Sequence, residues 1–442
     1  MMGRHAKQSE LWSTTQELSR RIPADNILRK INRLLDLDFV RQEVSSLYGQ
    51  NGNESVDPVQ IMKMMLLLFL DNVSSERELM RIIPLRIDYM WFLGYGLEDK
   101  IPHHSVLSKA RARWGFEVFS GLFKKTVELC WKKGLIDGSK IHVDSSVIRA
   151  DASLNSIVKV TVEKLEEDES EGEGMGVVNQ QHRSTTDPES TLSRRGGGSS
   201  APSYQVHRAH DDKKGVITAV QTTTGAVNEA HELPELVRQH QEHTGCQAQA
   251  VVGDSKYGTA ANFIFLAKSK IRAHMGDNRS KMVIKSAEGI YRVDQFEYVK
   301  AGDYFLCPAG QRLEQHHFVA TRGYYEYRTK VGICQGCPLR ESCTRAKDGR
   351  SVKRYEGQEY LDRARRQSRS QQAKQDRVKR QWLVEGKFGL AAVHHGMKRS
   401  RWRGMWKQAI QDYMIAGIQN LLVLLWPFFR AKSQYLPLVS HC

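Results

Sequence analysis

The chain has 442 residues, 40% of them apolar, and carries a formal net charge of +16 with a pI near 9.5. This length allows roughly two to four domains of about 150 residues, and the apolar content is sufficient for ordinary folded cores. The charge favours a polyanionic partner, because bound basic side chains release counterions, although a merely basic soluble protein would carry the same charge. The first residues are followed by no apolar segment, so nothing indicates export.

Residues 1 to about 135 are predicted to form an all-helical N-terminal domain. Apolar residues recur at helical spacing, and Asp57 and Pro58 open one of the helices with proline at an early position. A short basic helix follows, in which Arg111 and Arg113 are candidates for contacts with phosphates. A solvated face of a helical bundle would carry such residues equally well.

From Ile141 the pattern changes to short β-rich runs with helices between them. The runs 204–209 and 216–222 flank a turn and predict a β-hairpin. A helix, a strand run ending at Asp254, another helix and a final strand follow. This order predicts a mixed sheet with helices on its faces over residues 136–275, an α/β architecture.

Two stretches interrupt this core. Residues 155 to about 200 contain an acidic run and few large apolar side chains, so we expect a mobile or helical excursion there. Residues 276–365 hold aromatic segments and clustered cysteines, and they predict a small, β-rich insertion domain. Residues 366–442 then return to the core, and their first part is rich in lysine and arginine.

The most apolar stretch runs from Ile410 to Phe429. It includes four polar residues, Gln411, Asp412, Gln419 and Asn420. A membrane would tolerate these poorly, and the apolar positions recur at helical spacing. We therefore expect a buried amphipathic helix, no membrane association, and a cytoplasmic protein.

Four of the seven cysteines cluster in the predicted insertion: Cys307, Cys334, Cys337 and Cys343. Disulfides are not expected in a reducing compartment. The pair Cys334 and Cys337 has the two-residue gap of a zinc knuckle, and four thiolates would make a closed structural Zn²⁺ site. The spacing is irregular, with 26 residues between Cys307 and Cys334, so free thiols stay open as the alternative.

Three acids stand in settings suited to metal chemistry. Asp144 is expected at the end of the apolar strand run 140–146, Asp254 at the end of a second run, and Glu385 in a helix. An acid at the end of a buried strand points to the sheet edge where α/β folds place their chemistry. The three carboxylates could hold a pair of Mg²⁺ ions, or Mn²⁺, an arrangement suited to in-line attack on a phosphodiester.

Several short motifs are spread over most of the chain: Ser55–Val59, Ile101–Ser105, His142–Ser146, Asp187–Glu189 with Arg194–Gly196, Gly253–Gly258, Val384–Gly389 and Gln419–Leu421. In their order and spacing they resemble the DDE transposases of bacterial insertion sequences, in the group related to insertion sequence 1182. The resemblance implies an RNase H-like core with Asp144, Asp254 and Glu385 as its catalytic, metal-binding triad. It also implies an insertion domain between the second acid and the glutamate.

The chain departs from the family pattern around the glutamate. Related transposases place a tyrosine and an arginine seven and four residues before it, and a lysine seven residues after it, where this chain has Val378, Gln381 and Ala392. Neighbouring basic residues are expected to take over the phosphate contacts. The predicted DNA-binding set is Arg111, Arg113, Arg194, Arg195, Arg377, Arg380, Lys398, Arg399, Arg401 and Arg403.

These features predict a metal-dependent transposase that cleaves double-stranded DNA at the ends of an element and joins the ends to target DNA, as a homodimer. Three alternatives stay open. An RNase H-like nuclease without strand transfer would share the three acids. A DNA-binding regulator that uses the cysteines and basic segments would need no acids, and an inactive transposase copy would keep the fold alone.

Overall fold

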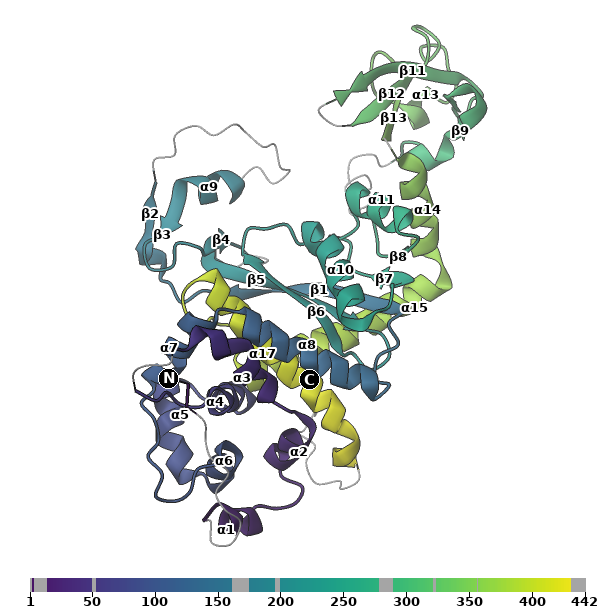
Figure 1. The fold of residues 1–442 in the computed structure, drawn as a ribbon. Coiled ribbons are helices and arrows are strands. Elements are labelled where there is room, and N and C mark those ends of the chain that lie inside the picture. The colour runs from purple at the N-terminus through teal and green to yellow at the C-terminus, as the bar shows by residue number, and fades with distance from the viewer. Residues whose placement is uncertain are drawn as a thin grey trace. The chain divides into compact units, whose positions relative to one another are not determined.

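The computed structural model describes residues 2–3, 14–49, 53–160, 175–194, 199–277, 289–320, 323–355 and 357–430. It separates into two compact units (Figure 1). The first comprises Met1–Ala250 and Val378–Cys442, and the second comprises Val251–Arg377.

The first unit begins with a helical region, as predicted. Its helices are α1 (Thr14–Arg21), α2 (Ile27–Leu34), α3 (Asp38–Val44), α4 (Pro58–Leu70), α5 (Glu76–Ile82), α6 (Ile87–Leu93), α7 (Ser105–Trp114) and α8 (Glu117–Lys132). Asp57 caps α4 by accepting a hydrogen bond from the Val59 amide at 2.9 Å, and Pro58 occupies the first turn. Nearly every side of α4 is apolar and buried, so the neighbouring helices pack around it.

An antiparallel ladder follows the helices. Its strands are β1 (Lys140–Arg149), β4 (Thr191–Ser193), β5 (Ala201–Asp211) and β6 (Ile217–Thr224). The central strand β5 pairs with β1, β4 and β6, and the predicted hairpin of β5 and β6 is confirmed. Helix α10 (Leu233–Thr244) packs against β6. The expectation of a mixed α/β architecture behind a helical N-terminal region is confirmed.

The apolar C-terminal stretch forms α17 (Met405–Arg430), which Figure 1 shows in yellow alongside α8. The helix is buried as predicted, but it is buried on almost every side rather than along one face, so the amphipathic interpretation is wrong. Its polar residues are buried because they have partners within the fold. The Asn420 amide, for example, accepts from the Ile217 amide and donates to the Ile217 carbonyl, both at 2.8 Å.

The predicted excursion contains a short paired ladder and a helix. Strand β2 (Ile157–Lys159) pairs with β3 (His182–Ser184), and α9 (Met175–Gln181) precedes β3. The acidic run lies outside the described residues.

The second unit contains a small antiparallel sheet in the order β13-β12-β11-β10-β9. The first strand of this unit, β7 (Ala250–Val252), has its first residue, Ala250, in the first unit. The further elements are α11 (Ala260–Lys268), β8 (Arg272–His274), β9 (Glu297–Val299), β10 (Tyr304–Leu306), β11 (Arg312–Val319), β12 (Tyr324–Arg328), α13 (Arg340–Cys343), β13 (Ser351–Tyr355) and α14 (Gln358–Arg369). The helix α15 (Gln371–Arg380) leads back to the first unit, where a π-helical turn (Gln381–Glu385) and α16 (Gly386–His395) follow.

Within the described part of the chain, no helix is both long and apolar enough to cross a membrane.

Candidate catalytic site

Asp144 lies in the middle of β1, so the prediction that it ends a strand is wrong. β1 continues to Arg149 because its residues pair with β5 over the whole length. The Asp144 carboxylate forms an ion pair with Arg380, with 2.8 Å between Oδ2 and Nη1. Both side chains are largely buried, at 18% and 13% exposure. This pair joins the middle of β1 to the helical segment that carries Glu385.

One face of β1 contacts the C-terminal segment repeatedly. His142, Asp144 and Ser146 share this face because alternate residues of a strand point the same way. Besides the Asp144 pair, Lys398 Nζ donates a hydrogen bond to Ser146 Oγ at 2.6 Å. The backbone of the segment also pairs with the end of β1, since the Arg149 amide donates to the Lys398 carbonyl at 3.0 Å. The acid of β1 is therefore set within a row of contacts with residues after position 377.

Asp212 completes this row, and its part in it was not predicted from the sequence. Its carboxylate accepts from His142 Nε2 at 2.7 Å and pairs with Lys379 Nζ at 2.8 Å. Although burial acts to raise it, these two partners hold the pKa of Asp212 below its ordinary value. The side chain of His142 is fully buried, so its bond to Asp212 lies inside the fold. The only sequence signal was the run of basic residues around Lys379.

Glu385 is the last residue of the π-helical turn, and its side chain is exposed. A π-helical turn bonds residue i to i+5, so residues five apart occupy the places that residues four apart hold in an α-helix. Arg380 stands five residues before Glu385. The π-helical turn therefore brings Arg380 and Glu385, five residues apart, toward the same side of the helix.

Asp254 belongs to the second unit. It lies two residues beyond β7, as a residue that follows a strand end, and its Oδ1 accepts a hydrogen bond from the Lys256 amide at 2.9 Å. The turn is tightly packed, because a Cβ atom at Gly258 would lie 1.8 Å from the carbonyl oxygen of Gly276. Glycine is therefore required at this position of the Gly253–Gly258 motif.

The donor set suits hard divalent cations. Asp144, Asp254 and Glu385 offer carboxylate oxygens, which Mg²⁺ and Mn²⁺ prefer to nitrogen or sulfur ligands. The Asp144 carboxylate keeps partial solvent access and has its charge compensated by Arg380.

The structure corrects the expectation for Arg111. Its side chain is only 4% exposed, pairs with Glu76, and stacks over the Trp402 ring with 3.9 Å between the guanidinium carbon and the ring centroid. The sequence predicts a solvated or DNA-bound basic face for α7, but Arg111 points into the helical core, and burial lowers its pKa. Arg111 is therefore structural and is removed from the predicted DNA contacts.

The other predicted DNA-binding residues differ in how exposed their side chains are. Arg401 is bound within the fold, because it donates to the Val73 carbonyl and to Asn72 Oδ1. Those with exposed side chains in the first unit are Arg113, Arg194, Lys398, Arg399 and Arg403. Arg377 of the second unit donates to the Ser368 carbonyl at 2.9 Å. Arg195 lies outside the described residues.

Two family models match the chain. One, described as a transposase domain, matches residues 16–113, and the other, a transposase DDE domain, matches residues 306–425. The first match lies in the helical region. The second includes Arg380, Glu385 and Lys398. No protein with curated annotation matches the chain.

Solved structures of transposases show distant likeness. The piggyBac transposase synaptic complex with hairpin DNA is 10% identical with a TM-score of 0.37, over 95% of this chain and 78% of that one. The Mos1 transposase paired-end complex with the left transposon end is 10% identical with a TM-score of 0.18, over 53% of this chain and 64% of that one.

Proposed function

Since this chain is a DDE transposase of the insertion-sequence type, we propose that Asp144, Asp254 and Glu385 are the acids with which it cleaves the ends of its element and joins them to target DNA. The observation that carries this proposal is the ion pair of Asp144 with Arg380, because it holds the carboxylate of β1 against the helical segment that bears the glutamate. We also propose that the mixed sheet belongs to an RNase H-like core, the fold that the sequence resemblance implies.

Asp254 completes the proposed set. The amides of Gln249 and Ala250 both donate to the carbonyl of Ser139, directly before β1, at 2.6 and 3.2 Å. Asp254 lies two residues beyond β7, and the sequence resemblance implies that it is the second acid of the set.

The metal ions that this family uses would be Mg²⁺ or Mn²⁺ held by the three carboxylates. When bound, they would lower the pKa of an attacking water or 3′-hydroxyl and stabilise the leaving oxygen. The residues of the chain prepare the site. Arg380 orients the Asp144 carboxylate by donating to it, and the remaining N–H groups of its guanidinium can donate to a DNA phosphate.

The proposed partner is double-stranded DNA. The exposed basic residues Arg113, Arg194, Lys398, Arg399 and Arg403 offer contacts with phosphates, which position a duplex without reading its sequence. The net charge of +16 supports such binding by counterion release. Joining requires two element ends to be held together, so we propose that a homodimer acts on DNA.

Cleavage by acid variants tests the proposal. The purified full chain is incubated with its own element ends and Mg²⁺ or Mn²⁺, and Asp144→Asn, Asp254→Asn and Glu385→Gln are compared with Asp137→Asn. Asp137 is an exposed acid just before β1 and serves as the matched control. Each of the three variants should lose cleavage by roughly a hundredfold or more while retaining DNA binding, and the control should cleave normally. Equal loss of binding and cleavage would count against a metal role.

A second measurement addresses whether the three acids share one site. Fe²⁺ bound in place of Mg²⁺ generates radicals that cut the backbone next to its ligands. Cuts near positions 144, 254 and 385 that all disappear in Asp144→Asn would support one shared site. Cuts at two positions that are unaffected by Asp254→Asn would remove Asp254 from it.

The nuclease alternative is separated by supplying ends that are already cut. A transposase joins them to a second DNA, whereas a nuclease leaves them unjoined.

A further inference from the structure

Four cysteines from separate segments of the second unit gather around one small cavity. Cys307 directly follows β10, Cys334 and Cys337 lie in the turns before α13, and Cys343 is the last residue of α13. All four line the same cavity, although 26 residues of sequence separate the first from the second. The four cysteines can therefore belong to one site although their spacing in the sequence is irregular.

The turns at these cysteines present sulfur in the manner of metal knuckles. At Cys307 the Gly310 amide donates to the cysteine carbonyl at 2.8 Å, and the Gln311 amide donates to Sγ at 3.3 Å. An N–H donor directed at sulfur stabilises the thiolate, the form that binds metal. At Cys337 the Arg340 amide donates to the cysteine carbonyl at 3.1 Å, closing a second tight turn.

The four thiols lie close enough to share one cavity, and Cys343 is the buried one of the four. All four cysteines are free thiols. Four thiolates in one place repel each other unless a cation lies among them.

A bound metal would stabilise the small sheet of this unit. Its buried core is small: Phe296, Phe305, Leu313, Tyr327, Cys343 and Val352. Between β12 and β13 the chain forms turns and the four-residue helix α13. Small folds with little apolar core commonly depend on a structural metal.

We propose that Cys307, Cys334, Cys337 and Cys343 bind one Zn²⁺ ion, which fixes the segment between β12 and β13 to the rest of the small sheet. Four thiolates make a closed tetrahedral zinc site with no open position for chemistry. The zinc site shares no residue with the proposed catalytic acids, so it can be tested without measuring DNA cleavage.

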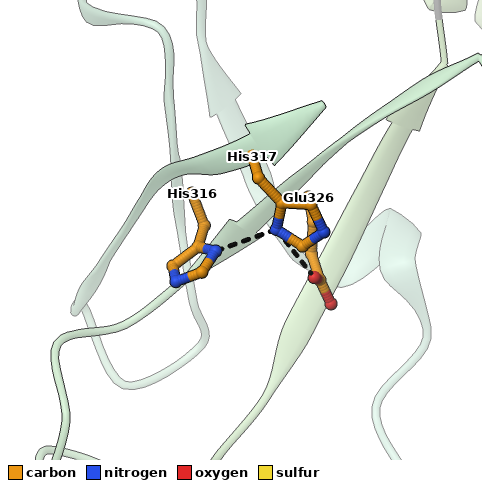
Figure 2. Close-up of side chains that lie close together, drawn as sticks. All are labelled: His316, His317 and Glu326. Carbon is orange, nitrogen blue, oxygen red and sulfur yellow. Dashed lines mark hydrogen bonds and ion pairs between the residues drawn. The ribbon is translucent and has the colours of Figure 1, made fainter. Parts of the chain in front are cut away.

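A competing metal group lies in the same unit. A β-bulge between Gln315 and His317 disturbs the alternation of β11, so that His316 and His317 both lie near Glu326, as Figure 2 shows. Their ligand atoms all lie within 4.8 Å of one another, and the cysteine sulfurs are spaced more widely. However, both histidines are exposed, and Glu326 also pairs with Arg328 at 3.0 Å. Zn²⁺ prefers the softer thiolates, and binding would draw the cysteine turns inward.

The test measures zinc bound to the full-length chain purified without added metal. We expect about one Zn²⁺ per chain, released by a mercurial reagent that blocks thiols. Cys337→Ser should lose the metal, whereas Cys246→Ser, a free cysteine of the first unit, and His317→Ala, which breaks the competing group, should retain it. A second readout is Co²⁺ in place of zinc, whose sulfur-to-cobalt charge-transfer absorption reports thiolate ligands directly in the unmutated protein.

Two results would overturn the proposal. One is zinc that persists in Cys337→Ser and disappears in His317→Ala. The other is unmutated protein that takes up neither zinc nor cobalt with a thiolate spectrum. The cobalt spectrum decides the matter even if Cys337→Ser fails to fold.

Discussion

Replacing Arg380 by glutamine removes the cation that compensates Asp144 and tests the pairing at the centre of the proposed site. Two unit charges about 4 Å apart attract by about 4 kcal/mol at an effective dielectric constant of about 20, whereas exposed pairs contribute about 1 kcal/mol or less. Asp144 and Arg380 are 18% and 13% exposed, between these cases. We therefore expect Arg380→Gln to lower the free energy of unfolding by about 2 kcal/mol without divalent cations.

The assay is urea unfolding of the full chain, followed by a signal from the first unit, in EDTA and in Mg²⁺. The double variant Asp144→Asn with Arg380→Gln should lose less stability than the two single variants lose in sum. Each single variant leaves one unmatched charge, whereas the double variant leaves none. Mg²⁺ should raise the free energy of unfolding of Arg380→Gln more than that of the unmutated chain, because a cation that binds the native carboxylate stabilises the fold. Arg238→Gln, which removes a 62% exposed arginine from surface pairs, is the matched control and should change stability by about 0.5 kcal/mol or less.

Either of two results would contradict this prediction. A coupling energy between Asp144 and Arg380 within about 0.3 kcal/mol of zero would mean that the pair does not hold β1 to the helical segment. An equal response to Mg²⁺ in Arg380→Gln and in the double variant would mean that Asp144 is not a ligand.

Three further predictions follow from single residues. Arg111→Ala should lower the free energy of unfolding by about 3 kcal/mol, so that any effect on DNA binding comes from lost folding. Arg113→Ala should leave the melting temperature nearly unchanged and weaken DNA binding directly. Burial raises the pKa of Asp412 from 3.8 to about 7, so its proton is held more tightly in the folded state. Its contribution to stability is complete below about pH 4 and is lost as the pH rises to about 7, and Asp412→Asn should flatten melting temperatures measured over that range. Gly258→Ala would place its Cβ against a backbone carbonyl, so we expect lost cleavage with Asp254 displaced; normal cleavage would show that the turn can yield.

Periodicity and turn residues predicted much of the architecture. The hairpin of β5 and β6, the capped start of α4 and the position of Asp254 after a strand each depend on local patterns, which short segments carry by themselves. The burial of the helix near Asn420 was also predicted from its apolar spacing. Its polar positions were misjudged, because their partners lie on β6 and α8, far away in sequence.

The errors share a physical cause. The end of β1 depends on the length of its partner β5, so Asp144 could not be placed within the strand from its own run of residues. The exposure of Arg111 depends on Trp402 and Glu76, which only the tertiary fold brings to α7. The cysteine cavity likewise depends on how β10 and the turns before α13 are arranged, which no spacing rule encodes.

Because of the π-helical turn that ends at Glu385, the number of residues between two side chains does not by itself give their positions on the helix. A search template that requires an interval of four residues between arginine and glutamate would score this protein as a mismatch, although its π-helical turn brings residues five apart to one side of the helix. Templates that allow a single-residue insertion at this point would recover chains that share the arrangement. Some apparent losses of the arginine in distant sequences would then be understood as a change in helical pitch, with the side chain itself retained.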